Sequence, residues 1–174
     1  MRFRKKKPEN EKLQRIHLNI MRNKRCDAIF HAIFYNDLAA VRQLAANGNA
    51  DTVDEMGDSA LTCAIARKNM DAAKILLEHG ADPLAADYPG DNALHVGARR
   101  GNIELVRLLL DYQKDLDATG QDGFSAINYA MAFNHFEIAR ILHKARASID
   151  IPDFVFHMTA RQWAIVKKCP RLFE

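Results

Sequence analysis

Gly90-Asp91-Asn92-Ala93-Leu94 has a counterpart 33 residues before it, Gly57-Asp58-Ser59-Ala60-Leu61, and another 33 residues after it, Gly123-Phe124-Ser125-Ala126-Ile127. A fixed period of this length is the sequence signature of a protein built from stacked repeats. A segment rich in Leu, Ile or Ala comes after each copy in the same register, at residues 70–77, 103–110 and 136–143. The pattern predicts that each unit consists of a helix, a turn, a second helix and a loop.

This repeat resembles that of the ankyrin family, whose unit of about 33 residues contains a Thr-Pro-Leu-His-like tetrapeptide and, later, a Leu-Leu pair followed by Gly-Ala-Asp. The best matches in this chain are Asn92-Ala93-Leu94-His95 and Leu76-Leu77-Glu78-His79-Gly80-Ala81-Asp82. A degenerate unit precedes them at residues 27–56, and a shortened one begins at Thr159, so the resemblance covers residues 25–169. It implies a mainly α fold, an ankyrin-repeat solenoid of stacked antiparallel helix pairs with hairpin-like loops.

We expect the chain to be divided into a tail, a cap and a row of repeats. No single unit can bury both of its helices, so burial comes from stacking, and the end units need polar outer faces. Leu13, Ile16 and Ile20 fall on one helical face, which suggests a helix that covers the first unit. The expected parts are a basic disordered tail at 1–10, an N-terminal capping helix at 11–23, and ankyrin repeats over 24–174, at 24–56, 57–89, 90–122, 123–155 and, as a terminal partial repeat, 156–174.

One repeat position predicts where the first helix of each unit begins. Its side chains can accept hydrogen bonds from the free amides at a helix N-terminus; they are Asp27, Ser59, Asn92, Ser125 and Thr159. The Leu and Ile pairs supply the bulk of each second helix. We therefore expect first helices near 59–68, 92–101 and 125–134, and second helices near 70–79, 103–112 and 136–145.

His95 stands where the resemblance implies a histidine that ties its own helix to the neighbouring hairpin by hydrogen bonds from side chain to backbone. The other units hold Thr62, Asn128 and Gln162 at this position. All of these side chains can donate or accept hydrogen bonds. We interpret His95 as structural rather than catalytic.

The glycine that closes the second helix is less regular than the rest of the unit. It is present as Gly48 and Gly80 but becomes Gln113 and Arg146 in the later repeats. A left-handed residue that carries a Cβ atom costs about 1 kcal/mol. Either these two loops take another path or the C-terminal half is held less tightly, and the sequence leaves both open.

The charge of the chain is unevenly distributed. Residues 1–25 carry 10 Lys and Arg against 2 Glu, whereas the remainder carries 15 against 20 acidic residues. The basic run Arg2, Arg4, Lys5, Lys6 and Lys7 is followed by Pro8-Glu9 rather than by an apolar stretch, which excludes an ordinary signal peptide. It is interpreted as a solubilising tail, a nuclear address, or a weak contact with nucleic acid or an anionic membrane.

Composition favours an intracellular class of protein. The chain has 174 residues, 48% of them hydrophobic, and no run approaches the roughly 18 apolar residues of a membrane span. Cys26, Cys63 and Cys169 are an odd number without paired spacing, which is typical of reduced thiols in a cytosolic protein. We expect a monomeric cytoplasmic protein, or a nuclear one if the source is eukaryotic.

The sequence offers little enzyme chemistry. Gly57-Asp58-Ser59 superficially resembles the Gly-Asp-Ser block of a family of lipases and esterases, but the register makes Ser59 equivalent to Asn92 and Ser125, which are helix caps. A serine hydrolase also needs a positioned base and oxyanion donors, and no His here stands in a supporting motif. We expect no enzymatic activity, no cofactor and no metal site.

The resemblance implies that a partner protein binds the concave surface formed by hairpin tips and first-helix ends. The register places these candidate residues there: Phe34, Tyr35, Met56, Arg67, Tyr88, Asp91, Arg99, Arg100, Asp122, Phe124 and Phe133. Tyr and Arg are among the residues that dominate interface energies. The basic centre, Arg67, Arg99 and Arg100, suggests a partner segment with acidic and apolar groups. In the alternative interpretation, Phe34 and Phe133 only pack against adjacent repeats and the arginines only solvate the face.

The function expected from these features is that of a non-enzymatic protein–protein interaction module of the adaptor, inhibitor, immunity or effector type. The alternative is a regulator associated with nucleic acid or a membrane through its basic tail. Contacts made by the tail would weaken steeply with rising salt, whereas a packed aromatic groove would respond less.

Overall fold

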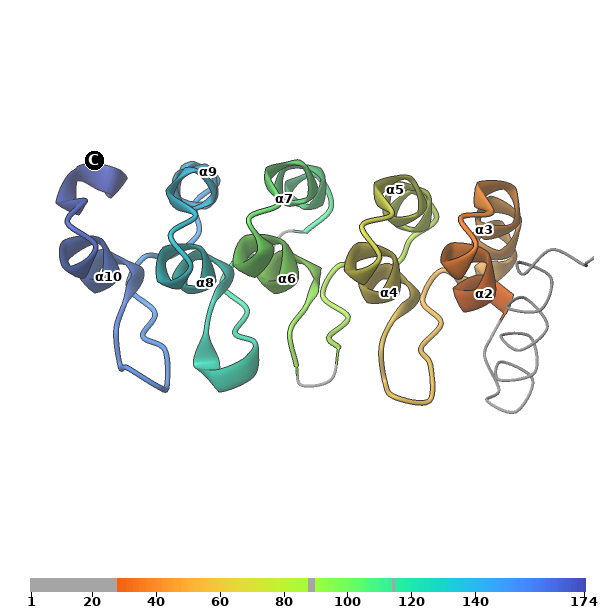
Figure 1. The fold of residues 1–174 in the computed structure, drawn as a ribbon, viewed down its shortest axis with the longest axis horizontal. Coiled ribbons are helices and arrows are strands. Elements are labelled where there is room, and N and C mark those ends of the chain that lie inside the picture. The colour runs from red at the N-terminus through yellow and green to blue at the C-terminus, as the bar shows by residue number, and fades with distance from the viewer. Residues whose placement is uncertain (1–27, 88–89, 114) are drawn as a thin grey trace, which may run out of the picture.

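The computed structural model describes residues 28–87, 90–113 and 115–174. Its helices form two rows, with hairpin-like loops projecting beyond the inner row (Figure 1). The inner helices are α2 (Ala28–Phe34), α4 (Ala60–Ala66), α6 (Ala93–Arg100), α8 (Ala126–Ala132) and α10 (Ala160–Val166). The outer row contains α3 (Leu38–Leu44), α5 (Met70–Glu78), α7 (Ile103–Leu110), α9 (Phe136–Lys144) and the short 3-10 turn η3 (Pro170–Phe173). The predicted solenoid of helix pairs is confirmed.

The expected caps begin the inner helices. Ser59 accepts a hydrogen bond from the amide of Thr62, and Thr159 does the same for Gln162. Asn92 and Ser125 occupy the equivalent positions of α6 and α8 and also act as caps. The outer helices have caps that the sequence analysis did not single out, namely Asp37, Asn69 and Asn102. All six helices predicted in the three central units are present.

The core lies between the two rows and between successive units. Leu61, Leu94 and Ile127 are fully buried on the inner helices, as are Leu76, Leu109 and Leu142 on the outer ones. Each such side chain contributes about 1.5–3 kcal/mol relative to an exposed one. Gly97 lets α6 approach α7 closely, since a Cβ atom there would lie 3.2 Å from Leu105. Stability is thus distributed along the whole stack.

Each loop between units is closed by a backbone hydrogen bond across its tip. The amides of Asp54, Asp87 and Gly120 donate to the carbonyls four residues later, at 2.8–2.9 Å. In the last loop one additional residue is accommodated, and Asp153 N donates to Met158 O at 3.1 Å. Two isolated bridges, Val53 with Ser59 and Thr119 with Ser125, join the bases of two of these hairpins.

The two loops that lack the closing glycine behave differently. Arg146 keeps the glycine path, with φ +78° beside +87° for Gly80, and Ala147 N donates to Leu142 O as Ala81 N donates to Leu76 O. Gln113 takes another path: it is buried, and its Nε2 donates to Asp115 O at 2.6 Å. Arg146 therefore stores conformational strain, whereas Gln113 replaces the turn with a side-chain hydrogen bond.

Some expectations lie outside the described residues. These are the basic tail at 1–10, the capping helix at 11–23, the cap Asp27, and Tyr88 at the second hairpin tip. Within the described ranges, no helix has the length and apolar character that crossing a membrane would require.

Candidate functional site

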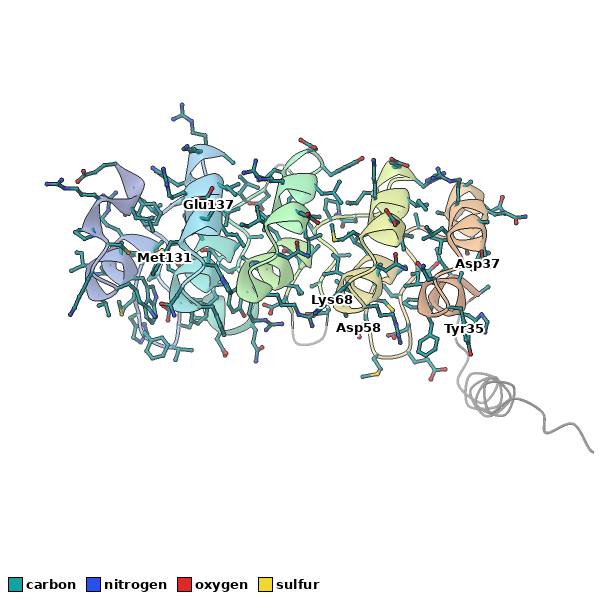
Figure 2. All side chains as sticks on the ribbon, turned by 45° about the horizontal axis from the view of Figure 1, so that its top comes forward. Tyr35, Asp37, Asp58, Lys68, Met131 and Glu137 are labelled. Carbon is teal, nitrogen blue, oxygen red and sulfur yellow. The ribbon has the colours of Figure 1, made fainter. Side chains whose placement is uncertain are left out.

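The predicted partner-binding residues gather where the inner helices end and the hairpins project. We call this surface the inner face; it contains Tyr35, Met56, Arg67, Arg100, Asp122 and Phe133, which are all exposed. Figure 2 shows Tyr35, Asp58 and Lys68 on this side, away from Asp37 and Glu137 on the outer helices. Phe34 and Arg99 lie half-buried within the same surface.

Two of the predicted contact residues are buried and are removed from this surface. Asp91 is 0% and Phe124 7% exposed. They occupy equivalent positions in successive repeats, just after the hairpin glycine. Phe124 stacks on Tyr129, with ring centroids 4.9 Å apart, and Asp91 lies under the following hairpin. The register located the hairpin, but it did not show that Tyr129 packs against both residues.

Asp91 is the centre of a polar cluster that joins two units. Its carboxylate accepts hydrogen bonds from Gln121 N at 3.0 Å and from the Tyr129 hydroxyl at 3.0 Å, and Arg99 Nη1 lies 2.8 Å from Oδ2. The third hairpin has Gly120 where the others have Asp54, Asp87 and Asp153. A Cβ atom on Gly120 would collide with Asp91 Oδ1, so the glycine makes room for a carboxylate from the preceding unit.

The cluster fixes the protonation of its members. Burial raises the pKa of the Tyr129 phenol, and the charge of Asp91 raises it further; the phenol therefore stays a hydrogen-bond donor. Burial lowers the pKa of His95, whose Nδ1 accepts from Asn92 N at 3.1 Å and whose Nε2 donates to Ala118 O at 2.8 Å. The result is a neutral imidazole of one tautomer, in agreement with the predicted structural role.

The helix ends on the inner face are bound by side chains of the next unit. The last carbonyls of a helix lack partners within the helix. Ala66 O accepts from Arg100 Nη1 at 3.4 Å, Arg99 O from His135 Nε2 at 3.2 Å, and Ala132 O from Lys167 Nζ at 3.2 Å. These side chains thus help to hold the stack together, and Arg100 and Lys167 also place positive charge at helix C-termini, where it is favourable.

Aromatic rings accompany these cations. Arg67 lies over the ring of Phe34, with Cζ 4.0 Å from the centroid, and Arg99 lies 5.5 Å above Tyr129. Phe133 contacts Tyr129 at 6.4 Å between centroids but remains 52% exposed. The arginines do more than solvate the face, because they contact the preceding repeat or a buried carboxylate. Phe133 keeps an uncovered face.

An aromatic group outside the candidate residues given above lies in the last unit. Phe154 and Phe156 at the fourth hairpin tip are 69% and 57% exposed. Phe156 packs edge-on against Trp163, at 5.4 Å, and Trp163 donates to the buried Asp153 at 3.2 Å. Trp163 lies four residues before Lys167, as Tyr129 lies four residues before Phe133. Residues at i and i+4 share a helix face, so this spacing was a signal in the sequence for the two side-chain pairs.

Two features bear on enzyme chemistry: the surroundings of the candidate serine Ser59 and the grouping of possible metal ligands among the described residues. Among them no group of three His, Cys, Asp or Glu side chains is placed to hold a metal ion. Ser59 is 2% exposed, and its hydroxyl is bonded to the amide and the hydroxyl of Thr62, at 3.1 and 3.0 Å. It is a helix cap, as its register predicted. The surface offers cations, aromatic rings and apolar hairpin tips, which is the chemistry of binding.

A comparison with protein families gives one match over most of the chain. The family model described as "Ankyrin repeats (3 copies)" matches residues 8–87 and 85–153. No curated protein matches the chain.

Proposed function

The chain thus belongs to the ankyrin repeat family, and we propose that it is a non-enzymatic interaction module that binds a partner protein on its inner face. Ankyrin repeats generally mediate protein–protein interaction. The observation that carries the proposal is the group of exposed apolar side chains on the last two units. Its members are Phe133, Phe154, Val155 and Phe156, each more than half exposed.

These side chains are costly to leave in water. Apolar side chains that gather on one surface mark interaction sites when they exceed what isolated surface residues explain. Phe133 contacts the ring of Tyr129, and Phe156 packs edge-on against the ring of Trp163. Each phenylalanine is therefore held in part by a neighbouring aromatic side chain. Rings held in this way offer contact area with little further loss of side-chain entropy.

The charges beside the rings indicate the kind of partner. Arg67, Lys68, Arg100 and Lys168 are exposed cations at the ends of the inner helices. Their basic row runs alongside the apolar hairpin tips. We propose a partner segment that presents acidic side chains to the helix ends and apolar side chains to Phe133 and Phe156.

The experiment compares two double variants in recovery of binding proteins from the native cell. Phe133→Ala with Phe156→Ala removes the two supported rings. The matched control, Ile103→Ala with Tyr112→Ala, removes side chains that are 37% and 38% exposed at the start and just past the end of the outer helix α7. Truncation at a hot spot costs about 2 kcal/mol or more, roughly a 30-fold loss of affinity.

We expect the wild type and the control to recover the same protein and the inner-face variant to lose it. Equal recovery by all three would contradict the proposal. Loss of the protein from every bait at high ionic strength, with no effect of the ring substitutions, would instead favour the basic tail as the binding element.

A further inference from the structure

The last unit is incomplete on its outer side. The outer helices α5, α7 and α9 have nine, eight and nine residues, whereas η3, which takes the same place in the last unit, has four. Phe173 of η3 packs edge-on against His143 of α9, at 5.2 Å. Because η3 is short, it covers less of α9 than a full outer helix would. A cavity of about 880 Å³ lies there, between α9, the loop at 146–150 and η3.

The space is lined by apolar side chains at its base. His143 is half-buried there, as is Leu110 at the equivalent position of α7. The cavity has an apolar floor made by Ile149, Leu172 and Phe173. The apolar face of an amphipathic helix would be buried against this floor.

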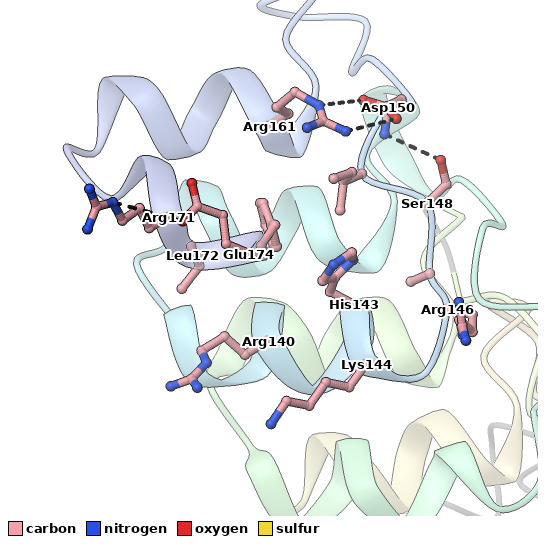
Figure 3. A pocket seen from close by; sticks show the side chains of 13 residues that line it. Arg140, His143, Lys144, Arg146, Ser148, Asp150, Arg161, Arg171, Leu172 and Glu174 are labelled. Carbon is pink, nitrogen blue, oxygen red and sulfur yellow. Dashed lines mark hydrogen bonds and ion pairs between the residues drawn. The ribbon is translucent and has the colours of Figure 1, made fainter.

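The rim of the cavity is strongly basic (Figure 3). It carries five cationic side chains, Arg140, Lys144, Arg146, Arg161 and Arg171, against the carboxylates of Asp150 and Glu174. Arg161 is paired with Asp150 at 3.0 Å, but Arg171 lies 3.9 Å from Glu174. Within the described residues neither Lys144 nor Arg146 forms an ion pair. A net positive field remains at the rim.

A polar end cap does not by itself account for this charge. Residues 26–138 carry 8 Lys and Arg against 17 Asp and Glu, whereas residues 139–174 carry 7 against 3. Arg146 also holds a left-handed φ of +78° where Gly48 and Gly80 stand in the earlier units. Strained backbone positions cluster at binding sites, where the side chain has a use that outweighs the strain.

We propose that this cavity binds an acidic amphipathic helix of a partner protein. The apolar face of that helix lies on Ile149, Leu172 and Phe173. Its acidic flanks face Arg140, Lys144 and Arg146. The site is separate from the inner face and does not depend on it.

The test uses a fluorescein-labelled, Ala-rich peptide of about four helical turns with Leu at i, i+3, i+4 and i+7 and Glu on both flanks. Binding to the full chain is followed by fluorescence anisotropy. One matched peptide has Lys in place of Glu, and another carries two prolines at its centre, which break the helix. We expect saturable binding of the acidic helix, with binding of both matched peptides weaker by about 10-fold or more, which corresponds to about 1.4 kcal/mol.

Protein variants locate the binding. Arg140→Glu should weaken it by about 10-fold or more. Arg107→Glu, the equivalent exposed position on α7 outside the cavity, and the inner-face variant Phe133→Ala with Phe156→Ala should each leave it within about 2-fold. Arg146→Gly should weaken it while raising the melting temperature by about 2–4 °C, since the strain is relieved. If Arg146 had only a structural role, its replacement by Gly would not lower the affinity for the peptide while raising the melting temperature.

The proposal is overturned if the acidic helix shows no saturable binding, or if the Lys peptide binds as tightly. It is equally overturned if the proline peptide binds as well as the helical one, since charge attraction alone would then be responsible. An Arg140→Glu effect no larger than that of Arg107→Glu would have the same consequence. None of these outcomes bears on the inner face, whose test uses different variants.

Discussion

At the scale of single residues, a histidine and an asparagine perform the same task in neighbouring units. His95 Nε2 donates to Ala118 O, and Asn128 Nδ2 donates to Ile151 O, both at 2.8 Å. Each bond ties an inner helix to the hairpin that comes after it. Thr62 is too short for this and bonds to Ser59 O instead, at 2.9 Å. Bonding to the next hairpin requires a side-chain donor of sufficient length. The imidazole of His95 also makes the stability of this contact dependent on pH.

His95→Asn should reduce the sensitivity of the fold to acid. Burial lowers the pKa of His95 in the folded state, so below about pH 6.5 the unfolded chain binds a proton that the folded chain does not. Stability therefore falls as pH drops below about 6.5, by at most about 1.4 kcal/mol per pH unit for this group. Urea unfolding at about pH 7.5, 6.5 and 5.5 measures this slope. An unchanged slope in His95→Asn would show that other groups produce it.

At the scale of elements, the hairpins contact one another as well as their helices. Asp91 accepts a hydrogen bond from Gln121 N in the third hairpin, and Phe154 N in the fourth hairpin donates to Asp122 O at 2.8 Å. Asp51 and Asp117 likewise bind amides of the next loop, at Asp82 and Ser148. Neighbouring loops are therefore linked to one another at several points along the stack.

Asp91→Ala should destabilise the fold by roughly 3 kcal/mol, because it leaves the Tyr129 hydroxyl and Gln121 N without their acceptor and Arg99 without its carboxylate. Arg99 is 30% exposed at its side chain, so water limits the loss. A cycle with Tyr129→Phe measures the coupling by chemical unfolding, and we expect about 0.5–3 kcal/mol. Strictly additive effects would mean that the two side chains do not act together.

At the scale of the whole molecule, the burial of a repeat position depends on whether another unit packs beyond it. Met131 on α8, which is labelled in Figure 2, is 0% exposed, whereas Ile165, its equivalent on α10, is 63% exposed. Arg161 stands where the other inner helices have Leu61, Leu94 and Ile127. The end of the stack thus combines a polar substitution with an uncovered apolar side chain, and it exposes surface that would be core one unit earlier.

The same truncation at these two positions should therefore have different consequences. Met131→Ala should cost about 2–5 kcal/mol, since it leaves a cavity between α8 and α10. Ile165→Ala should change the free energy of unfolding by no more than about 0.5 kcal/mol. Thermal or chemical unfolding of both variants provides the comparison. Similar losses at the two positions would indicate that α10 is covered in solution, by a second copy or by a further part of the protein.

The sequence by itself determined the period, the unit and the helix starts. These features are encoded over short distances: a cap such as Ser59 or Asn92 satisfies amides within the first turn of its own helix, and Leu76 or Leu109 marks a core position wherever the unit recurs. The register also located hairpin tips and helix ends, so Met56, Arg100 and Phe133 were correctly expected at the surface.

Only the tertiary structure decided which of these positions are covered. Asp91 and Phe124 look like tip residues in the sequence, but Gln121 and Tyr129 bind the carboxylate of Asp91, and the ring of Tyr129 stacks on Phe124. It likewise decided that Arg146 keeps the glycine turn while Gln113 leaves it, and that the end of α9 is open beside η3. The burial and charge environment of a side chain depend on contacts between units. The repeat pattern is the same in every unit, so it does not contain the differences between an inner unit and the last one.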